Sequence, residues 1–250
     1  YNLRYGDFKA RISGYYTRIY DQSKVISYYD DVAATFTNFA MSGIDKVHFG
    51  LEAAVSIPIY HTLALNGAVS WGQYTYDSNP YYLQTQDNSG DIVSDGYVYW
   101  KDFRVESTPQ TAVNVGLSWR SNNNIYLSAD FNYYNNMYLS MSPIYRTDAV
   151  ITGGMAPGDI EHLRRQEKFD SAYTLNASIG KNWYIHRKYT LGFSLDVKNI
   201  LNNQDIKTGG YEQTRLSKNT ETTVTTYQAF DSKYFYMFGT TYYLNLYFRF

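Results

Sequence analysis

The sequence contains no cysteine and only 5 prolines in 250 residues. The lack of cysteine excludes disulfides and thiolate zinc sites, and it is compatible with a protein of the cell envelope. No run of about 18 apolar residues is present, which excludes a transmembrane helix. A net charge of −1 without a basic patch argues against a nucleic-acid binder held by phosphate contacts.

Aromatic residues are abundant instead, with 29 Tyr, 13 Phe and 4 Trp. Mean hydropathy is −0.46, which does not argue against a membrane, since a barrel strand needs only about 10 residues of alternating polarity. The opening residues Tyr1 to Arg4 are typical of a folded region and not of a signal peptide. We therefore expect that an exported protein has lost its start or is represented here in part.

The last eleven residues, Thr240 to Phe250, alternate strictly in polarity. Side chains alternate between the two faces of a strand, so one face of this segment is apolar and the other polar. The apolar face comprises Tyr242, Leu244, Leu246, Phe248 and Phe250. Bacterial outer-membrane barrels end in this way, and the alternative is a half-buried edge strand of a soluble sandwich.

Seven earlier segments repeat the same alternation. In one of them, Val47, Phe49 and Leu51 share a face, and His48 and Gly50 lie opposite. The eight predicted strands are Asp7–Tyr20, Lys46–Ile57, Thr62–Tyr74, Thr111–Arg120, Asn124–Tyr134, Ala172–Lys181, Lys188–Lys198 and Thr240–Phe250.

The connections between these strands alternate in length. Short links are predicted at 58–61, 121–124 and 182–187, and long ones at 21–45, 76–110, 135–171 and 199–239. Tight turns on one side and long loops on the other are typical of an outer-membrane barrel. Aromatic residues near the strand ends fit the two membrane interfaces, namely Tyr16, Trp71, Trp119, Tyr133, Tyr189 and Tyr242. The sequence thus predicts an all-β, antiparallel transmembrane β-barrel, whose eight strands could also close on their own.

Several segments resemble one family. They are Lys9–Arg18, Tyr28–Asp31, Met41–His48, Val197–Gln213 with its Asn-Ile-Leu-Asn-Asn and Gly-Gly-Tyr-Glu-Gln elements, and Phe230–Gly239 with the terminal strand. Together they are similar to the C-terminal end of Bacteroidota TonB-dependent outer-membrane transporters, of the carboxypeptidase-regulatory-like or SusC-related kind. The Asn-Ile-Leu-Asn-Asn element with its Gly-Gly-Tyr-Glu-Gln continuation is the most specific part.

The resemblance implies that residues 1–250 are the C-terminal part of one barrel domain, the last eight of about 22 strands. It implies import of a nutrient, namely a glycan, peptide or metal chelate, across the outer membrane of a Gram-negative bacterium. The implied partners are outer-membrane lipid, the other strands, the plug, the TonB complex acting through that plug, and the barrel assembly machinery, which reads the terminal strand. Whether a SusD-like surface lipoprotein is also a partner is left undecided, because the Gly-Tyr-Asp-Pro-Glu-like element of the SusC branch has no counterpart in this sequence.

Asparagines follow the strand that ends in Val197. Asn199, Asn202 and Asn203 tolerate left-handed backbone and cap turns, and Gly209-Gly210 permits a further bend. We interpret this segment as a structural turn into the last long loop.

The sequence offers little support for catalysis or metal binding. None of the histidines at 48, 61, 162 and 186 lies in a nucleophile or zinc motif, and His162 beside Asp159 and Glu161 fits a solvated loop best. Asp87, Ser89 and Asp91 have calcium-loop spacing, but Ile92 stands where glycine is needed. We predict no enzyme activity, no cofactor and no metal.

The predicted loop 76–110 supplies candidate substrate contacts. Tyr81, Tyr82, Tyr97, Tyr99 and Trp100 stand among Asn, Gln and Asp, a mixture that can stack on flat ligands or sugars. The alternative is that these rings pack the long loops together. Three hypotheses therefore remain: a transporter fragment, a self-contained structural or adhesive barrel of eight strands, and an outer-membrane hydrolase.

Overall fold

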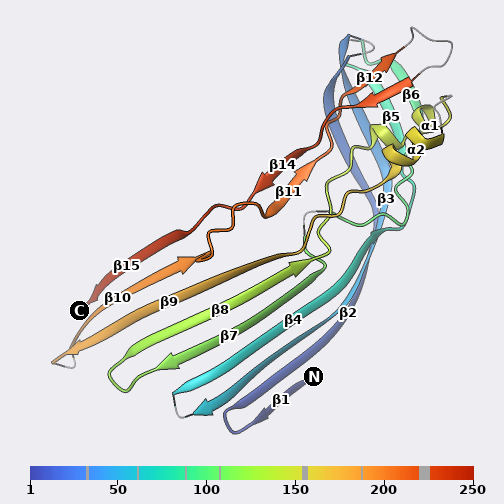
Figure 1. Ribbon diagram of the computed structural model, residues 1–250. Helices are drawn as coiled ribbons and strands as arrows, with labels where there is room; N and C mark the ends of the chain where they lie inside the picture. The colour runs from blue at the N-terminus through green and yellow to red at the C-terminus, as the bar shows by residue number, and fades with distance from the viewer. Residues whose placement is uncertain are drawn as a thin grey trace.

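The computed structural model describes residues 1–31, 34–60, 62–87, 89–106, 108–153, 157–186, 188–219 and 226–250. One antiparallel sheet dominates it (Figure 1). Its main path runs, in spatial order, through β1 (Asn2–Tyr5), β2 (Phe8–Asp30), β3 (Thr35–Tyr60), β4 (Leu63–Tyr76), β7 (Thr111–Arg120), β8 (Ile125–Asn135), β9 (Ala172–Ile185), β10 (Tyr189–Lys198) and β15 (Thr241–Arg249).

All eight predicted strands form, and each pairs with the next one in the predicted sequence. The sequence analysis missed β1, a short strand that pairs with Phe8 to Arg11. Two links are also shorter than predicted, because Pro58 to Tyr60 belong to β3 and Asn182 to Ile185 belong to β9. Within the described residues β1 and β2 form one edge and β15 the other, so these strands form an open sheet (Figure 1).

The predicted long loop 21–45 is wrong, because β2 and β3 continue through it as a hairpin. Two facing bulges explain the error. Ile19 pairs with Lys46, Gln22 with Ile44, and Lys24 with Met41, so each strand gains one extra residue in turn. An extra residue moves all the following side chains to the opposite face. The alternation therefore changes phase at this point, and the apolar pattern appears to end.

The two bulges occur at residues with left-handed backbone, Asp21 (φ 52°) and Gly43 (φ 73°). Their local contacts hold them together. The Asp21 amide donates to the Asp45 carboxylate at 3.0 Å, and the Ser78 hydroxyl donates to the Gly43 carbonyl at 2.6 Å. The phase change is thus built into the fold by specific turn chemistry.

The other three long connections contain secondary structure of their own. The second holds β5 (Tyr81–Gln86) and β6 (Ile92–Tyr97), of which β5 pairs with β3. The third holds η1 (Ile144–Arg146), α1 (Asp148–Ile151) and α2 (Pro157–Arg164). The fourth holds the pairs β11 (Lys207–Tyr211) with β14 (Lys233–Tyr236), and β12 (Leu216–Asn219) with β13 (Thr226–Ala229). None of the described helices is long and apolar enough to cross a membrane.

These connections pack together at one end of the sheet and form the only buried hydrophobic core found in the described residues. We call it the loop-end core. It consists of Tyr28, Phe39, Met41, Ile44, Tyr76, Tyr82, Val98, Trp100, Met141, Ile144, Tyr145, Val150 and Leu163. Residues from β2 and β3 join it because the bulges turn Tyr28, Phe39 and Met41 towards the loops.

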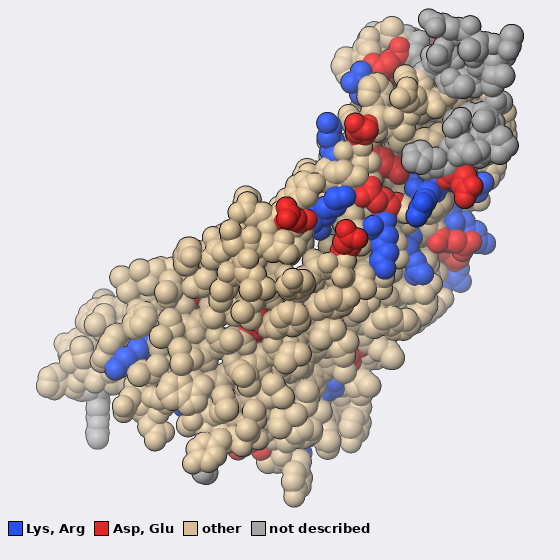
Figure 2. All heavy atoms as spheres, viewed as in Figure 1, with Lys and Arg blue, Asp and Glu red and all other residues tan. Residues whose placement is uncertain are grey.

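The main sheet below the bulges, formed by residues 8–19 of β2, residues 46–60 of β3, β4, β7, β8, β9, β10 and β15, has two different faces. The apolar face carries large exposed side chains on every strand, including Ile12, Leu51, Val69, Val115, Leu117, Leu127, Phe131, Ile179, Leu191, Leu244 and Leu246. Charged side chains gather at the loop end of the molecule, while the surface over the strands in Figure 2 is largely free of them. This distribution fits a sheet whose exposed face meets a nonaqueous environment.

Candidate functional site

The polar face of the same strands is organised by side-chain hydrogen bonds that run across the sheet. Ser56 donates to the Asn66 side-chain oxygen at 2.8 Å, and the Asn66 amide donates to Ser118 at 3.1 Å. A second chain runs through other strands, where Asn114 donates to Asn132 at 2.9 Å and Asn132 to Thr174 at 3.4 Å. A face this rich in short polar groups fits contact with water or polar solutes.

Tyrosines lie over glycines on this face at three places. Tyr126 pairs with Gly180 on the neighbouring strand, and Gly192 pairs with Tyr247. Tyr15 pairs with Gly50 in the same way, and its hydroxyl is 2.5 Å from the Tyr74 hydroxyl. An added Cβ at any of these glycines would collide with the ring. The absence of a side chain therefore lets each ring lie over the backbone of the neighbouring strand.

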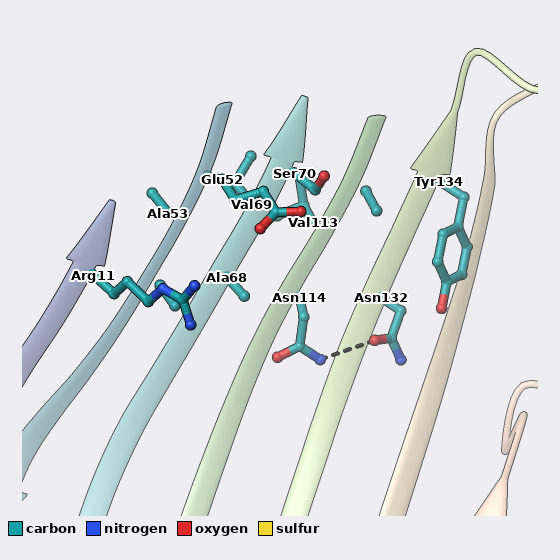
Figure 3. A pocket seen from close by; sticks show the side chains of 12 residues that line it. Arg11, Glu52, Ala53, Ala68, Val69, Ser70, Val113, Asn114, Asn132 and Tyr134 are labelled. Atoms are coloured by element: carbon teal, nitrogen blue, oxygen red, sulfur yellow. Dashed lines mark hydrogen bonds between the residues drawn. The ribbon is translucent and has the colours of Figure 1, made fainter. Parts of the chain in front are cut away.

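A hollow of about 280 Å³, whose surface is mainly apolar with a few polar groups, lies where β2, β3, β4, β7 and β8 run side by side (Figure 3). Its floor is lined by small residues, Ala54, Ala68 and Ala112. The polar side chains around it are Arg11, Glu52, Ser70, Asn114, Asn132 and Tyr134. We call this the wall hollow.

The charged groups of the wall hollow are not neutralised by one another. Arg11 donates from Nε to the Ser13 hydroxyl at 3.3 Å, and no described ion pair joins it to Glu52. Both charges are thus available to a solute or to another protein surface. The site can bind through hydrogen bonds and opposite charges, but it contains no nucleophile paired with a base.

The predicted loop aromatics do not gather in one site. Tyr82 and Trp100 are each only 1% exposed and belong to the loop-end core. Tyr81 and Tyr97 form an exposed T-shaped pair with ring centroids 5.6 Å apart. Tyr99 donates its hydroxyl to the Asp148 carboxylate at 2.6 Å, and the same carboxylate accepts from the Tyr97 amide at 2.7 Å. Substrate contact by these residues stays a prediction, and the exposed pair Tyr81 and Tyr97 is the part of it that a ligand could reach.

The asparagines that follow β10 have a structural role. Asn199 and Asn202 have left-handed backbone, at φ 51° and 52°, which confirms the turn at the asparagines. The further bend expected at Gly209 and Gly210 is wrong, because both residues lie within β11 and pair with β14. Asn199 is buried, and its side-chain amide donates to the carbonyls of Asn203 and Phe238 at 2.9 and 3.0 Å. It thereby joins the exit of β10 to the approach of β15.

The histidines do not join Asp or Glu in a group that could hold a metal ion among the described residues. His48 lies inside β3, not at a strand start as predicted, and its ring packs 4.7 Å from that of Tyr74. His186 occupies a turn with φ 52°. His61 lies outside the described residues, and the side chain of His162 is likewise not described.

A site that sequence reasoning missed is the buried ion pair between Arg146 and Glu212. Arg146 is 0% exposed, and its two terminal nitrogens donate to the Glu212 carboxylate at 2.5 and 2.8 Å. The same guanidinium donates to the Ser142 carbonyl at 3.1 Å and lies 5.4 Å from the centre of the Phe103 ring. The pair fastens the third and fourth connections to each other, and no local sequence pattern signals it.

Comparison with known proteins finds similarity only at the level of solved structures. No family model matches the chain, and no curated protein sequence matches it. Among solved structures, the chain is similar to FpvA of P. aeruginosa, in a complex with a heterologous pyoverdine and iron. The identity is 13% and the TM-score is 0.44, and the match covers 99% of this chain and 32% of FpvA. The chain therefore spans about a third of the length of that protein.

Proposed function

We propose that this chain is part of the wall of an outer-membrane β-barrel, and that the complete protein is a TonB-dependent transporter that imports a nutrient. The observation that carries the proposal is a single antiparallel sheet with one exposed apolar face, one hydrogen-bonded polar face and two free edges. The family resemblance of the terminal third adds the transporter class to this architecture. The substrate class is taken from the same resemblance and comprises glycans, peptides and metal chelates.

Strand length and aromatic placement support a membrane position. β7 and β10 have 10 residues each and β15 has 9, which matches the roughly 9–11 residues that a tilted strand needs to cross a bilayer. Aromatic residues lie towards both ends of the apolar face. Phe49 and Trp71 pack 6.3 Å apart near the loop end, and Tyr189 and Phe248 pack 5.8 Å apart near the turn end. Such rings suit the two membrane interfaces.

The two free edges of the sheet indicate a barrel with more strands than this chain supplies. β15 has all 9 residues exposed and pairs on one side only, with β10. On the far side of the sheet, β1 covers β2 only as far as Ile12, to which Tyr1 is hydrogen-bonded. Each orphan backbone group in hydrocarbon costs several kcal/mol, so both edges need further strands. We propose that these nine strands, β1 included, form part of a barrel of about 22 strands.

The polar face then lines the interior of the barrel, where the wall hollow with Arg11 and Glu52 meets the solute path or the plug. Energy would reach the complete transporter through a TonB-type partner contacting the plug. We propose transport and not catalysis as the role of the complete protein.

Expression of residues 1–250 alone tests the proposal directly. We expect no compact monomer, measured as the absence of heat-modifiable migration in gels, and no permeability of lipid vesicles. The complete protein should show both heat-modifiable migration and TonB-dependent uptake. A compact, heat-modifiable monomer formed by this chain alone would favour the self-contained eight-stranded barrel instead.

A further inference from the structure

Beyond the membrane-length strands, the sheet continues as a four-stranded extension. We call it the distal sheet, and it consists of residues 22–30 of β2, residues 35–42 of β3, β5 and β6. The ten residues from Asp21 to Asp30 add roughly 30 Å of strand at about 3.3 Å per residue. One face of the distal sheet is covered by the loop-end core, to which Phe39 and Tyr82 contribute.

The opposite side of the distal sheet, which we call the distal face, is uncovered. The strand registers place rows of side chains across it, such as Val25, Ala40 and Leu83. Val25 is 65% exposed and Phe36 is 60% exposed. The remaining large residues of this face are Tyr29, Tyr81, Ile92 and Tyr97, and they are exposed as well.

Aromatic rings are paired on the distal face in advance of any partner. Tyr29 and Phe36 form a T-shaped pair at 5.3 Å, and Tyr81 and Tyr97 form another at 5.6 Å. The Tyr81 hydroxyl donates to the Asp95 carboxylate at 2.5 Å, which fixes the orientation of that ring. Rigid, exposed aromatic anchors on a flat sheet are typical of protein interfaces.

The distal face lies outside the region that lipid can cover. It continues the apolar face, but the exposed ion pair of Arg18 with Asp77, at 2.6 Å, stands between them near the bulges. Under the proposed function, on which this step rests, that pair marks the water boundary. An apolar surface of this extent in water marks an interaction site.

Charge indicates what kind of partner the face fits. Its described residues include the carboxylates of Asp87 and Asp95, and they include no Lys or Arg. A second copy of this face would oppose like charges, which disfavours pairing of the face with itself. We propose that the distal face docks a different protein, which stands on the membrane surface beside the barrel and presents an apolar patch with Lys or Arg opposite Asp87 and Asp95.

Site-specific photocrosslinking in the complete protein, in its native outer membrane, tests the proposal. A benzophenone side chain at Leu83 or at Phe36 should form an adduct with one other protein. The same group at Lys101, which is exposed but lies outside the distal face, should not. Asp87→Lys with Asp95→Lys should lower the adduct yield at least tenfold, and a Lys→Asp or Arg→Asp change at the crosslinked position of the partner should restore it.

Other results overturn the proposal. They are an adduct with lipid, an adduct with a second copy of this protein, no adduct from either position, or an adduct yield that the charge reversals leave unchanged. Heat-modifiable migration of the same samples tests the barrel separately. Normal migration without an adduct contradicts the docking surface alone, whereas wild-type protein without heat-modifiable migration contradicts the proposed function.

Discussion

Arg146 and Glu212 stand 66 residues apart in the sequence, yet their side chains form a two-pronged ion pair in the interior of the loop end. Glu212 also accepts a hydrogen bond from the Ser142 amide at 2.8 Å, so one carboxylate serves a charged and a neutral donor. The pair therefore joins two long connections that share no strand of the main sheet.

Removal of one partner of this pair should loosen the loop end. Glu212→Gln leaves the Arg146 charge buried without its counterion, which costs about 3–5 kcal/mol where such pairs have been broken. We expect faster protease cleavage in the fourth connection while the strands stay protected. Arg215→Gln is the matched control, since its ion pair with Asp31 is exposed and should matter little. Equal cleavage of both variants would contradict the fastening role.

Charge placed on the apolar face should prevent insertion. Leu195→Arg should destabilise the folded barrel by about 2–4 kcal/mol near the bilayer midplane, whereas the adjacent Ser194→Arg should cost much less. Val115→Arg and Asn114→Arg form a second such pair, although Asn114 also gives up its hydrogen bond to Asn132. Folding yield of the complete protein in lipid vesicles measures the difference. Equal tolerance would mean that the faces are reversed or that no membrane is involved.

The ring over Gly192 predicts a substitution and its rescue. Gly192→Ala places a Cβ against the Tyr247 ring, and overpacking of this kind costs about 1–3 kcal/mol. Tyr247→Ser in the same chain should restore the stability by removing the ring. Gly67→Ala serves as a control, because its nearest contact is the Val55 side chain at 3.3 Å. Urea denaturation of the complete protein in lipid vesicles reports all three variants.

Loss of the terminal aromatics should affect assembly and not synthesis. Phe248 and Phe250 are exposed on the apolar face of the chain's last strand, as the sequence predicts. Phe248→Ser with Phe250→Ser should leave expression unchanged and reduce the amount of complete protein in the outer membrane. Tyr243→Ser, on the other face of β15, should have a smaller effect. Normal assembly of the double variant would remove the special role of this strand.

Alkaline pH should open the loop end before the strands. Burial raises the pKa of Tyr28 to about 12 and that of Tyr145 to about 12, from 10.0. Because both folded pKa values lie above the unfolded one, the stabilisation is complete below pH 10 and is lost as pH rises through about 12. Tyr145→Phe should remove part of this pH dependence, and it also removes the hydrogen bond to the Arg215 carbonyl. Protease cleavage of the loops between pH 9 and 12 checks the expectation.

The sequence predicted the strands well because each carries its own alternation, visible in Val47, Phe49 and Leu51. It failed between residues 21 and 45, where Asp21 and Gly43 shift the phase and the same strands look like a loop. Contacts between residues distant in the sequence could not be predicted, for a different reason. The stacking of Tyr126 on Gly180 depends on register, and the Arg146 to Glu212 pair depends on how two loops fold against each other.

The candidate site residues were likewise predicted only in part from the sequence. Aromatic composition identified Tyr81 and Tyr97, but it could not separate them from Tyr82 and Trp100. Neighbouring residues on a strand face opposite sides, so Tyr81 and Tyr82 lie on different surfaces of the distal sheet. The wall hollow could not be predicted, since Arg11, Glu52 and Tyr134 come from three different strands.

The two bulges divide the β2–β3 hairpin into two parts in which opposite sets of alternate residues face outward. Below the bulges, the exposed apolar side chains are at even-numbered positions of β2, such as Ile12, and at odd-numbered positions of β3, such as Leu51. Above the bulges this is reversed, with Val25 exposed in β2 and Phe36 exposed in β3. Deletion of Asp21 alone would invert Lys24 to Asp30 relative to the rest of the chain, and deletion of Gly43 alone would do the same to Thr35 to Met41. Loss of either residue would therefore turn core side chains outward, Tyr28 in the first case and Phe39 and Met41 in the second.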